Sequence, residues 1–118
     1  MGKSILKDKS YAFAIMIVKL SQFLVSEKRE LILSKQLLRS GTAVGALISE
    51  AEFAQSKKDF INKMSISLKE ANETLYGVDL LKDTNYINED EHQIHLTLNK
   101  EFVAMLMNSI KTSKSNIQ

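Results

Sequence analysis

Residues 37–87, LLRSGTAVGALISEAEFAQSKKDFINKMSISLKEANETLYGVDLLKDTNYI, contain no proline and decide the fold. They favour two amphipathic helices that meet at one polar corner, Gln55-Ser56. Ser56 is suited to cap the second of these helices, with Asp59 at the reciprocal position of a capping box. Apolar residues then recur every three or four positions, which is the stripe of a long bundle helix. The stripe consists of Phe60, Met64, Leu68, Ala71, Leu75 and Val78.

Small residues fill the centre of the first of these two helices, where Gly41 and Gly45 lie four positions apart on one face. A glycine inside a helix costs roughly 0.5–1 kcal/mol relative to alanine, so both positions need a compensating reason. Close approach of a neighbouring helix supplies that reason. The sequence therefore predicts that another helix packs tightly against this face.

Outside the central stretch, the same periodicity predicts one helix before it and one after it. Asn88 with Glu91 marks the start of the last helix. Its expected apolar stripe is Ile94, Leu98, Phe102, Met105 and Ile110. The four helices are expected over residues 8–26, 32–54, 57–83 and 89–111. Their short connections favour an all-α, antiparallel up-down-up-down four-helix bundle that forms a single domain over residues 1–118.

The first predicted helix is apolar around most of its circumference, through residues 11–18 and on to Val25. A helix at the edge of a monomeric bundle needs only one apolar stripe. An interface between subunits is one explanation for the excess, and a locally thick core is the other. The interface is favoured, which makes a homo-oligomer the expected state.

Composition limits the remaining possibilities. The chain has 118 residues, 44% of them hydrophobic and 25% charged, with no proline and no cysteine. Four glycines and no proline suit helices with few connections better than a β fold, and the lack of cysteine excludes disulfides and thiolate metal sites. The longest apolar run has eight residues, whereas a membrane span needs roughly 20. We expect a cytoplasmic protein with no membrane partner.

The two histidines, His92 and His95, form His-x-x-His, and Glu89 with His92 forms Glu-x-x-His. Di-iron bundles take Glu-x-x-His from two helices and further glutamates from the others, whereas both histidines here belong to one helix. A surface-exposed pair near the helix start is the favoured interpretation, so no metal site is predicted. The chain also lacks a Ser-His-Asp arrangement, a phosphate-binding loop and a dinucleotide motif. We therefore expect no enzymatic activity and no cofactor.

Three carboxylates form a second candidate constellation, with Glu70 and Glu73 on one helical face and Glu50 on the preceding helix. Acid–base chemistry or binding of a divalent cation would be the functional interpretation. Charged hydrogen bonding within or between subunits is the structural one. No nucleophile, histidine or glycine-rich loop is expected nearby, so a structural polar cluster is favoured.

A third set is basic, comprising Arg39, Lys57, Lys58 and Lys63. A single chain of net charge +2 has only a weak field for nucleic acid, and lysines of this kind are usually a solvated helix face. An oligomer would repeat the set around an axis and allow many weak phosphate contacts. Base stacking is not expected, because Tyr76 and Tyr86 lie in apolar or acidic parts of the sequence.

Taken in order, several motifs resemble the family of four-helix-bundle proteins encoded in intervening sequences of 23S ribosomal RNA genes. The chain departs from the family pattern at Leu47, where asparagine is common, and at Gly77, where an aromatic residue is common. The matching positions are Gln36, residues 39–42, Gly45, Ile48, Glu50, Ala51, residues 55–60 and residues 67–76.

The resemblance implies a bundle that assembles as a ring-shaped homopentamer. It also implies kinship with the accessory variability proteins of diversity-generating retroelements, which work with RNA and a reverse transcriptase. The expected function is a non-enzymatic, nucleic-acid-associated adaptor, linked to RNA and binding through phosphate contacts. The alternative is a protein–protein scaffold with no nucleic-acid contact of its own. Basic residues gathered on one face would favour the adaptor, and an apolar groove there would favour the scaffold.

Overall fold

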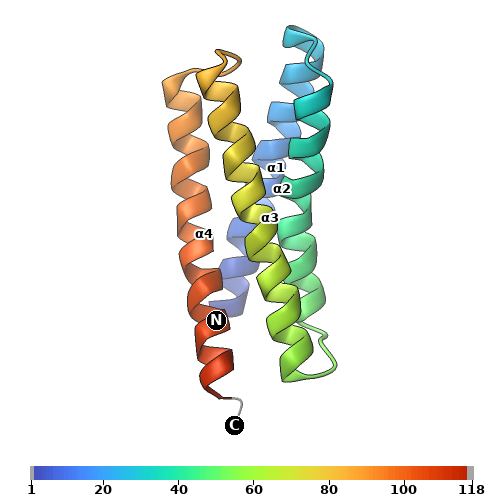
Figure 1. Cartoon of the computed structure of the whole chain (residues 1–118), viewed down its shortest axis with the longest axis vertical. Coiled ribbons are helices and arrows are strands. Elements are labelled where there is room, and N and C mark those ends of the chain that lie inside the picture. The colour runs from blue at the N-terminus through green and yellow to red at the C-terminus, as the bar shows by residue number, and fades with distance from the viewer. Residues whose placement is uncertain (1, 117–118) are drawn as a thin grey trace.

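The computed structural model describes residues 2–116 and contains four helices joined by short corners (Figure 1). Each helix packs against the next one in sequence, and α1 also packs against α4, so the helices surround one core. The bundle extends 50 × 22 × 21 Å. This arrangement confirms the predicted all-α, antiparallel up-down-up-down bundle. The helices are α1 (Gly2–Lys28), α2 (Ile32–Ala51), α3 (Lys57–Asp83) and α4 (Glu89–Ser115).

The helix ends differ from the predicted bounds except in α3. The α1 helix begins before residue 8, because nothing in residues 2–7 interrupts a helix and Leu6 is buried in the core. The α2 helix ends at Ala51, before residue 54, since the Phe53 and Ala54 amides turn back to the Glu50 and Ala51 carbonyls. The α4 helix continues past residue 111 to Ser115.

The two predicted helix starts are both present. The Asp59 amide donates to the Ser56 hydroxyl at the start of α3, but the Asp59 carboxylate accepts from the Gln55 amide rather than from Ser56. At α4 the capping box is complete, with Asn88 and Glu91 each accepting from the other's backbone amide. These caps determine the residues at which α3 and α4 begin.

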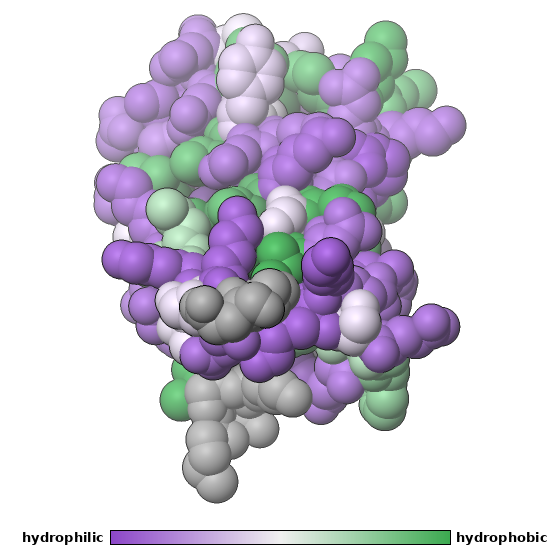
Figure 2. Space-filling model, turned by 60° about the horizontal axis from the view of Figure 1, so that its bottom comes forward, coloured by the Kyte–Doolittle hydropathy of each residue, from purple (hydrophilic) through white to green (hydrophobic). Residues whose placement is uncertain are grey.

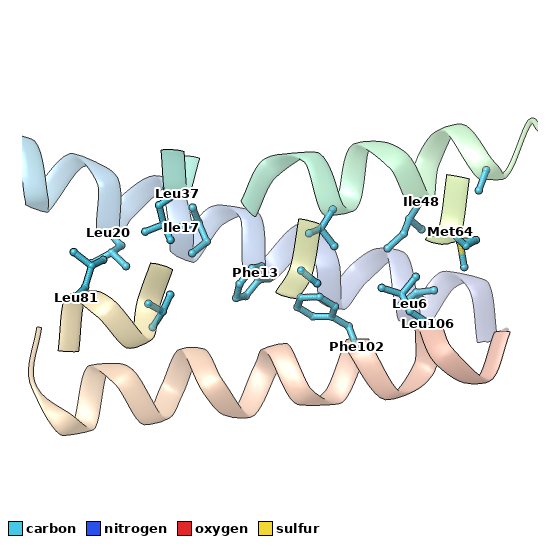
Figure 3. Packing of buried hydrophobic residues seen from close by; sticks show 14 of the residues in the cluster. Leu6, Phe13, Ile17, Leu20, Leu37, Ile48, Met64, Leu81, Phe102 and Leu106 are labelled. Atoms are coloured by element: carbon cyan, nitrogen blue, oxygen red, sulfur yellow. The ribbon is translucent and has the colours of Figure 1, made fainter. Parts of the chain in front are cut away.

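The core runs the length of the bundle, and Figure 3 shows part of it. Near its middle, the Phe13 and Phe102 rings meet edge to face, with centroids 4.9 Å apart. Gly41 and Gly45 both face α1, which confirms the predicted close approach. A Cβ added at Gly41 would lie 2.8 Å from two carbons of Ile17.

The predicted stripe of α3 is partly wrong. Leu68 and Leu75 are only half-buried, and Ser67 and Thr74 occupy the core positions instead. The Ser67 hydroxyl donates to the Val44 carbonyl, and the Thr74 hydroxyl lies 2.8 Å from that of Ser40. These bonds remove the cost of burying hydroxyls, so small polar residues allow α2 and α3 to pack closely.

The predicted stripe of α4 is also partly wrong. Ile94 is 59% exposed, while Leu98 and Met105 are half-buried. Three of the predicted core positions lie one residue before the buried ones. Toward the start of the helix, the positions that share the face of Phe102 are occupied by polar residues, so hydrophobicity alone does not mark them. The buried residues of α4 are His92, His95, Asn99, Phe102, Leu106 and Ile110.

The outward side of α1 carries Tyr11, Ile15, Val18 and Val25, all exposed, opposite its core-facing residues. The helix is therefore apolar on two sides, as the sequence indicates. Within residues 2–116, no helix is long and apolar enough to cross a bilayer.

Candidate nucleic-acid interface

The bundle topology brings three basic segments to one end of the molecule. The start of α1, the α2–α3 corner and the end of α4 lie together at the lower end of Figure 1. Figure 2 shows this end to be mostly hydrophilic. We call the exposed lysines of the last two segments the basic end: Lys57, Lys58, Lys111 and Lys114. None of them forms an ion pair with another residue in the described range 2–116.

The structure separates the four basic residues that the sequence groups together. Lys57 and Lys58 belong to the basic end. Lys63 Nζ lies 3.8 Å from Glu50 and 3.9 Å from Asp59, so its charge is partly neutralised. Arg39 lies away from this end, because it contacts Glu70 of α3. Glu70 is thirteen positions beyond Lys57, which corresponds to about 20 Å along the helix.

Arg39 holds two of the three predicted carboxylates together. It donates to Glu70 Oε2 at 3.2 Å and to Glu73 Oε2 at 2.9 Å. The hydrogen bond to Glu70, and then its charge, raises the pKa of the Arg39 guanidinium. The Glu70 side chain is only 14% exposed, and its Oε1 lies 3.2 Å from Arg39 but outside hydrogen-bonding geometry. Glu50 is not part of this cluster, since it faces Lys63.

Beside the Arg39 cluster, a groove of about 870 Å³ runs between α2 and α3. Leucines from both helices line it beside polar residues, and its charged lining residues are Arg39, Lys69 and Glu73. Tyr76, which is 69% exposed, also lines this groove. The lining residues on α2 are Leu33, Gln36, Leu37, Arg39 and Ser40, and those on α3 are Ser65, Leu68, Lys69, Asn72, Glu73, Tyr76, Gly77 and Leu80.

A smaller pocket of about 260 Å³ opens beside the basic end. All four helices contribute to it, through apolar walls that include Ile48, Phe60 and Met64, and its rim carries the 2.8 Å ion pair between Lys7 and Glu52. The sequence alone did not reveal either hollow, because each depends on how residues from different helices meet.

The prediction that the histidines form an exposed pair is wrong. His92 and His95 are 6% and 7% exposed, respectively. His92 Nε2 lies 2.6 Å from Asp79 Oδ1, and the His95 ring meets Phe13 edge to face. Burial lowers the pKa of His95, an effect that Glu91 opposes and His92 reinforces. The sequence does contain a signal for this burial. The two histidines, Asn99 and Phe102 recur every three or four positions, so they share the side of α4 that faces the core. Among residues 2–116, no three His, Asp or Glu side chains gather as a metal-binding group.

Comparison with known proteins identifies the family. The family described as 23S rRNA-intervening sequence protein matches residues 3–108. A crystal structure of a protein of unknown function from the S23 ribosomal protein family, from Bacteroides thetaiotaomicron VPI-5482, is similar to this chain, with 50% sequence identity and a TM-score of 0.92. That similarity covers 94% of this chain and 99% of the other. No curated protein matches the sequence. Because the family match covers most of the chain, the protein belongs to the 23S rRNA-intervening sequence protein family.

Proposed function

We propose that this chain is a non-enzymatic cytoplasmic adaptor that assembles as a ring-like homopentamer and binds nucleic acid, RNA above all. The observation that carries the proposal is the basic end, where the start of α3 with Lys57 and Lys58 and the end of α4 with Lys111 and Lys114 lie at one end of the bundle. An ammonium group without a carboxylate partner is free to contact phosphate. The family name, which refers to 23S rRNA, supports RNA as the ligand.

A ring strengthens weak phosphate contacts through repetition. One copy offers four lysines at the basic end, so five copies with parallel axes would offer about twenty on one face. Each phosphate contact releases counterions, and the affinity then falls linearly with salt on a log–log scale. Lysine ammonium groups give charge without base reading, so sequence preference is expected to be slight. Arg39 and Lys63 already face carboxylates and contribute less than the sequence alone predicts.

The test measures the fluorescence anisotropy of labelled structured RNA, single-stranded RNA and duplex DNA with the wild-type chain at low and rising salt. Binding that weakens steeply with salt, and that is lost in the Lys57→Gln/Lys58→Gln variant, supports the proposal. Absence of binding to all three probes at low salt overturns it. Binding that persists unchanged in the variant also overturns it.

The second candidate is a protein–protein scaffold, favoured by the apolar pocket beside the basic end. Phe53, in the adjacent α2–α3 corner, is 83% exposed. An apolar pocket next to an exposed phenyl ring suits an apolar side chain of another polypeptide better than a phosphate. The salt dependence separates the candidates, because apolar contacts do not weaken as salt rises.

A further inference from the structure

The pocket of about 260 Å³ beside the basic end is here called the end pocket. Sites for drug-sized ligands enclose roughly 300–1,000 Å³, so the end pocket suits a smaller group. Its lining includes the half-buried ring of Phe60 and the thioethers of Met64 and Met105. A flat aromatic ring stacks favourably on a phenyl ring and makes favourable contacts with thioether sulfur. The walls therefore suit a small aromatic group.

Two polar side chains of α4, Asn108 and Ser109, also line the end pocket. Within residues 2–116, neither side chain forms a hydrogen bond with another residue. The amide of Asn108 and the hydroxyl of Ser109 can each donate and accept. A nucleobase combines an apolar face with an edge of donors and acceptors, which matches this lining. An apolar amino-acid side chain would instead cover both polar groups without giving them partners.

Lysines of the basic end flank the end pocket on two helices. Lys57 precedes Phe60 by three positions, and Lys111 follows Asn108 by three, so each lysine shares a helical face with a lining residue. Three residues of a helix span about 4.5 Å along its axis. Because the sugar links each base to a phosphate, a strand whose phosphates contact these lysines holds its bases at the pocket.

The pocket selects bases that are not paired. In a duplex the bases are stacked inside the helix, and removing one costs unstacking and unpairing energy. In a single strand the bases are free to turn outward and stack on aromatic side chains. Stacking tolerates every base, so the pocket is consistent with a slight sequence preference.

We propose that the end pocket holds one unpaired base of a single-stranded RNA whose phosphates lie on the basic end. This inference rests on the proposed function and names its ligand class and a second contact. Phe60 and the two methionines stack and pack against the base, and Asn108 and Ser109 bind its edge. The sequence alone gave no expectation of base stacking, because the pocket is assembled from separate helices.

The first part of the test compares two strands of equal charge. One is a single-stranded RNA of mixed sequence, about ten nucleotides long, and the other has the same length but carries no bases. Fluorescence anisotropy gives the affinity of each for the wild-type chain at low salt. Both strands should bind through their phosphates. The strand with bases should bind about fivefold tighter or more, since stacking of one base contributes at least this much.

The second part locates the base by nuclear magnetic resonance of methionine methyl groups labelled with carbon-13. A base in the end pocket shifts the Met64 and Met105 signals through its ring current. Met16 is the internal control, because it belongs to α1 and does not line the end pocket. The strand with bases should shift Met64 and Met105 but not Met16. The strand without bases should leave all three signals nearly unchanged.

The third part fills the pocket. Ser109→Phe should bind the strand with bases no better than the strand without them, while its affinity for the latter stays at the wild-type level. Ala104→Phe adds the same ring at an exposed position of α4 that does not line the pocket, and should behave as the wild type. Circular dichroism establishes that each variant is folded. If Ser109→Phe does not fold, the exposed Asn108→Ala variant takes its place and should lose part of the base-dependent gain.

The outcomes separate this inference from the proposed function. Equal affinities for the two strands, or no shift of Met64 and Met105 by the strand with bases, would overturn the inference while phosphate binding at the basic end stands. A folded Ser109→Phe or Asn108→Ala variant that keeps the full base-dependent gain would also overturn it. Failure of both strands to bind at low salt would overturn the proposed function itself, and the inference with it.

Discussion

Gly41 sets the distance between α1 and α2. In Gly41→Ala, the new methyl group would lie 2.8 Å from two Ile17 carbons, and Ile17 is completely buried. Overpacking typically costs about 1–3 kcal/mol, whereas the gain in helix propensity is about 1 kcal/mol. We expect the free energy of unfolding to fall, as measured by urea denaturation. Gly77→Ala is the matched control, because its new methyl group meets only the end of the Leu37 side chain, at 3.1 Å. Equal losses in both variants would contradict this explanation.

His95 makes the stability depend on pH. Burial lowers its pKa below the ordinary value of 6.5, so the folded chain holds it neutral while the unfolded chain protonates it first. The unfolded state therefore binds more protons, and stability rises with pH. The contribution is complete above about pH 6.5 and is lost as the pH falls from there toward the pKa of the folded state.

The corresponding experiment compares urea midpoints at about pH 7.5 and about pH 5.5, which lie on either side of the ordinary histidine pKa. We expect the wild type to lose more stability than His95→Leu over this interval. His95→Leu keeps an apolar group in the core and removes the titrating ring. An equal loss in both proteins would show that other groups cause the pH dependence.

At the scale of the helices, the caps decide where α3 and α4 begin. In Asn88→Ala, the bond from the Glu91 amide to the Asn88 side chain at the start of α4 is lost, while the backbone amide of residue 88 can still donate to the Glu91 carboxylate. A lost cap typically costs about 1 kcal/mol, and we expect this decrease in the free energy of unfolding. Asn62→Ala is the control, since Asn62 is exposed inside α3. An Asn88→Ala variant as stable as Asn62→Ala would exclude a role for the cap.

The same scale shows how far the sequence determines the structure. Helix count, corners and caps follow from local patterns, because apolar spacing and capping residues act within a few positions of the chain. The exact core face does not. Leucine is the better core residue by hydrophobicity alone, so Leu68 and Leu75 suggest a stripe that in fact belongs to Ser67 and Thr74. The Ser67 hydroxyl donates to the Val44 carbonyl of α2 and the Thr74 hydroxyl contacts Ser40 of α2, and no local pattern reveals these partners.

The histidines and the basic set show the same limit. His92 is buried beside Asp79 of α3, a partner from another helix. Arg39 and Lys63 carry positive charge in the sequence, but the fold places carboxylates against both of them. The start of α3, with Lys57 and Lys58, lies at the same end as the end of α4, with Lys111 and Lys114, only because an up-down-up-down bundle returns the chain to that end.

For the whole molecule, folding is expected to need no metal ion. The core is apolar, with buried hydroxyls and amides that are hydrogen-bonded by the chain itself, as in the bond from Asn99 to the Ala71 carbonyl. Treatment with EDTA should leave the helical circular dichroism and the melting temperature unchanged. A marked decrease in either would direct attention to Glu70, Glu73 and the two histidines.

The central claim is that the bundle gathers separate basic segments into one phosphate-binding end. The most direct measurement is the slope of log affinity against log salt for a labelled single-stranded RNA. It is determined for the wild type, for Lys57→Gln/Lys58→Gln and for Lys35→Gln/Lys100→Gln. The third protein loses the same charge at exposed positions outside the basic end. Each phosphate contact contributes about 0.7 to the magnitude of this slope for a single strand.

We expect the basic-end variant to bind weakly with a shallower slope, while the control variant keeps nearly the wild-type affinity and slope. Neither pair belongs to the core, so the melting temperatures should agree. Equal weakening in the two variants would show that only net charge matters and that the basic end is not the binding site. That result, or a wild type that binds no RNA at low salt, would contradict the account.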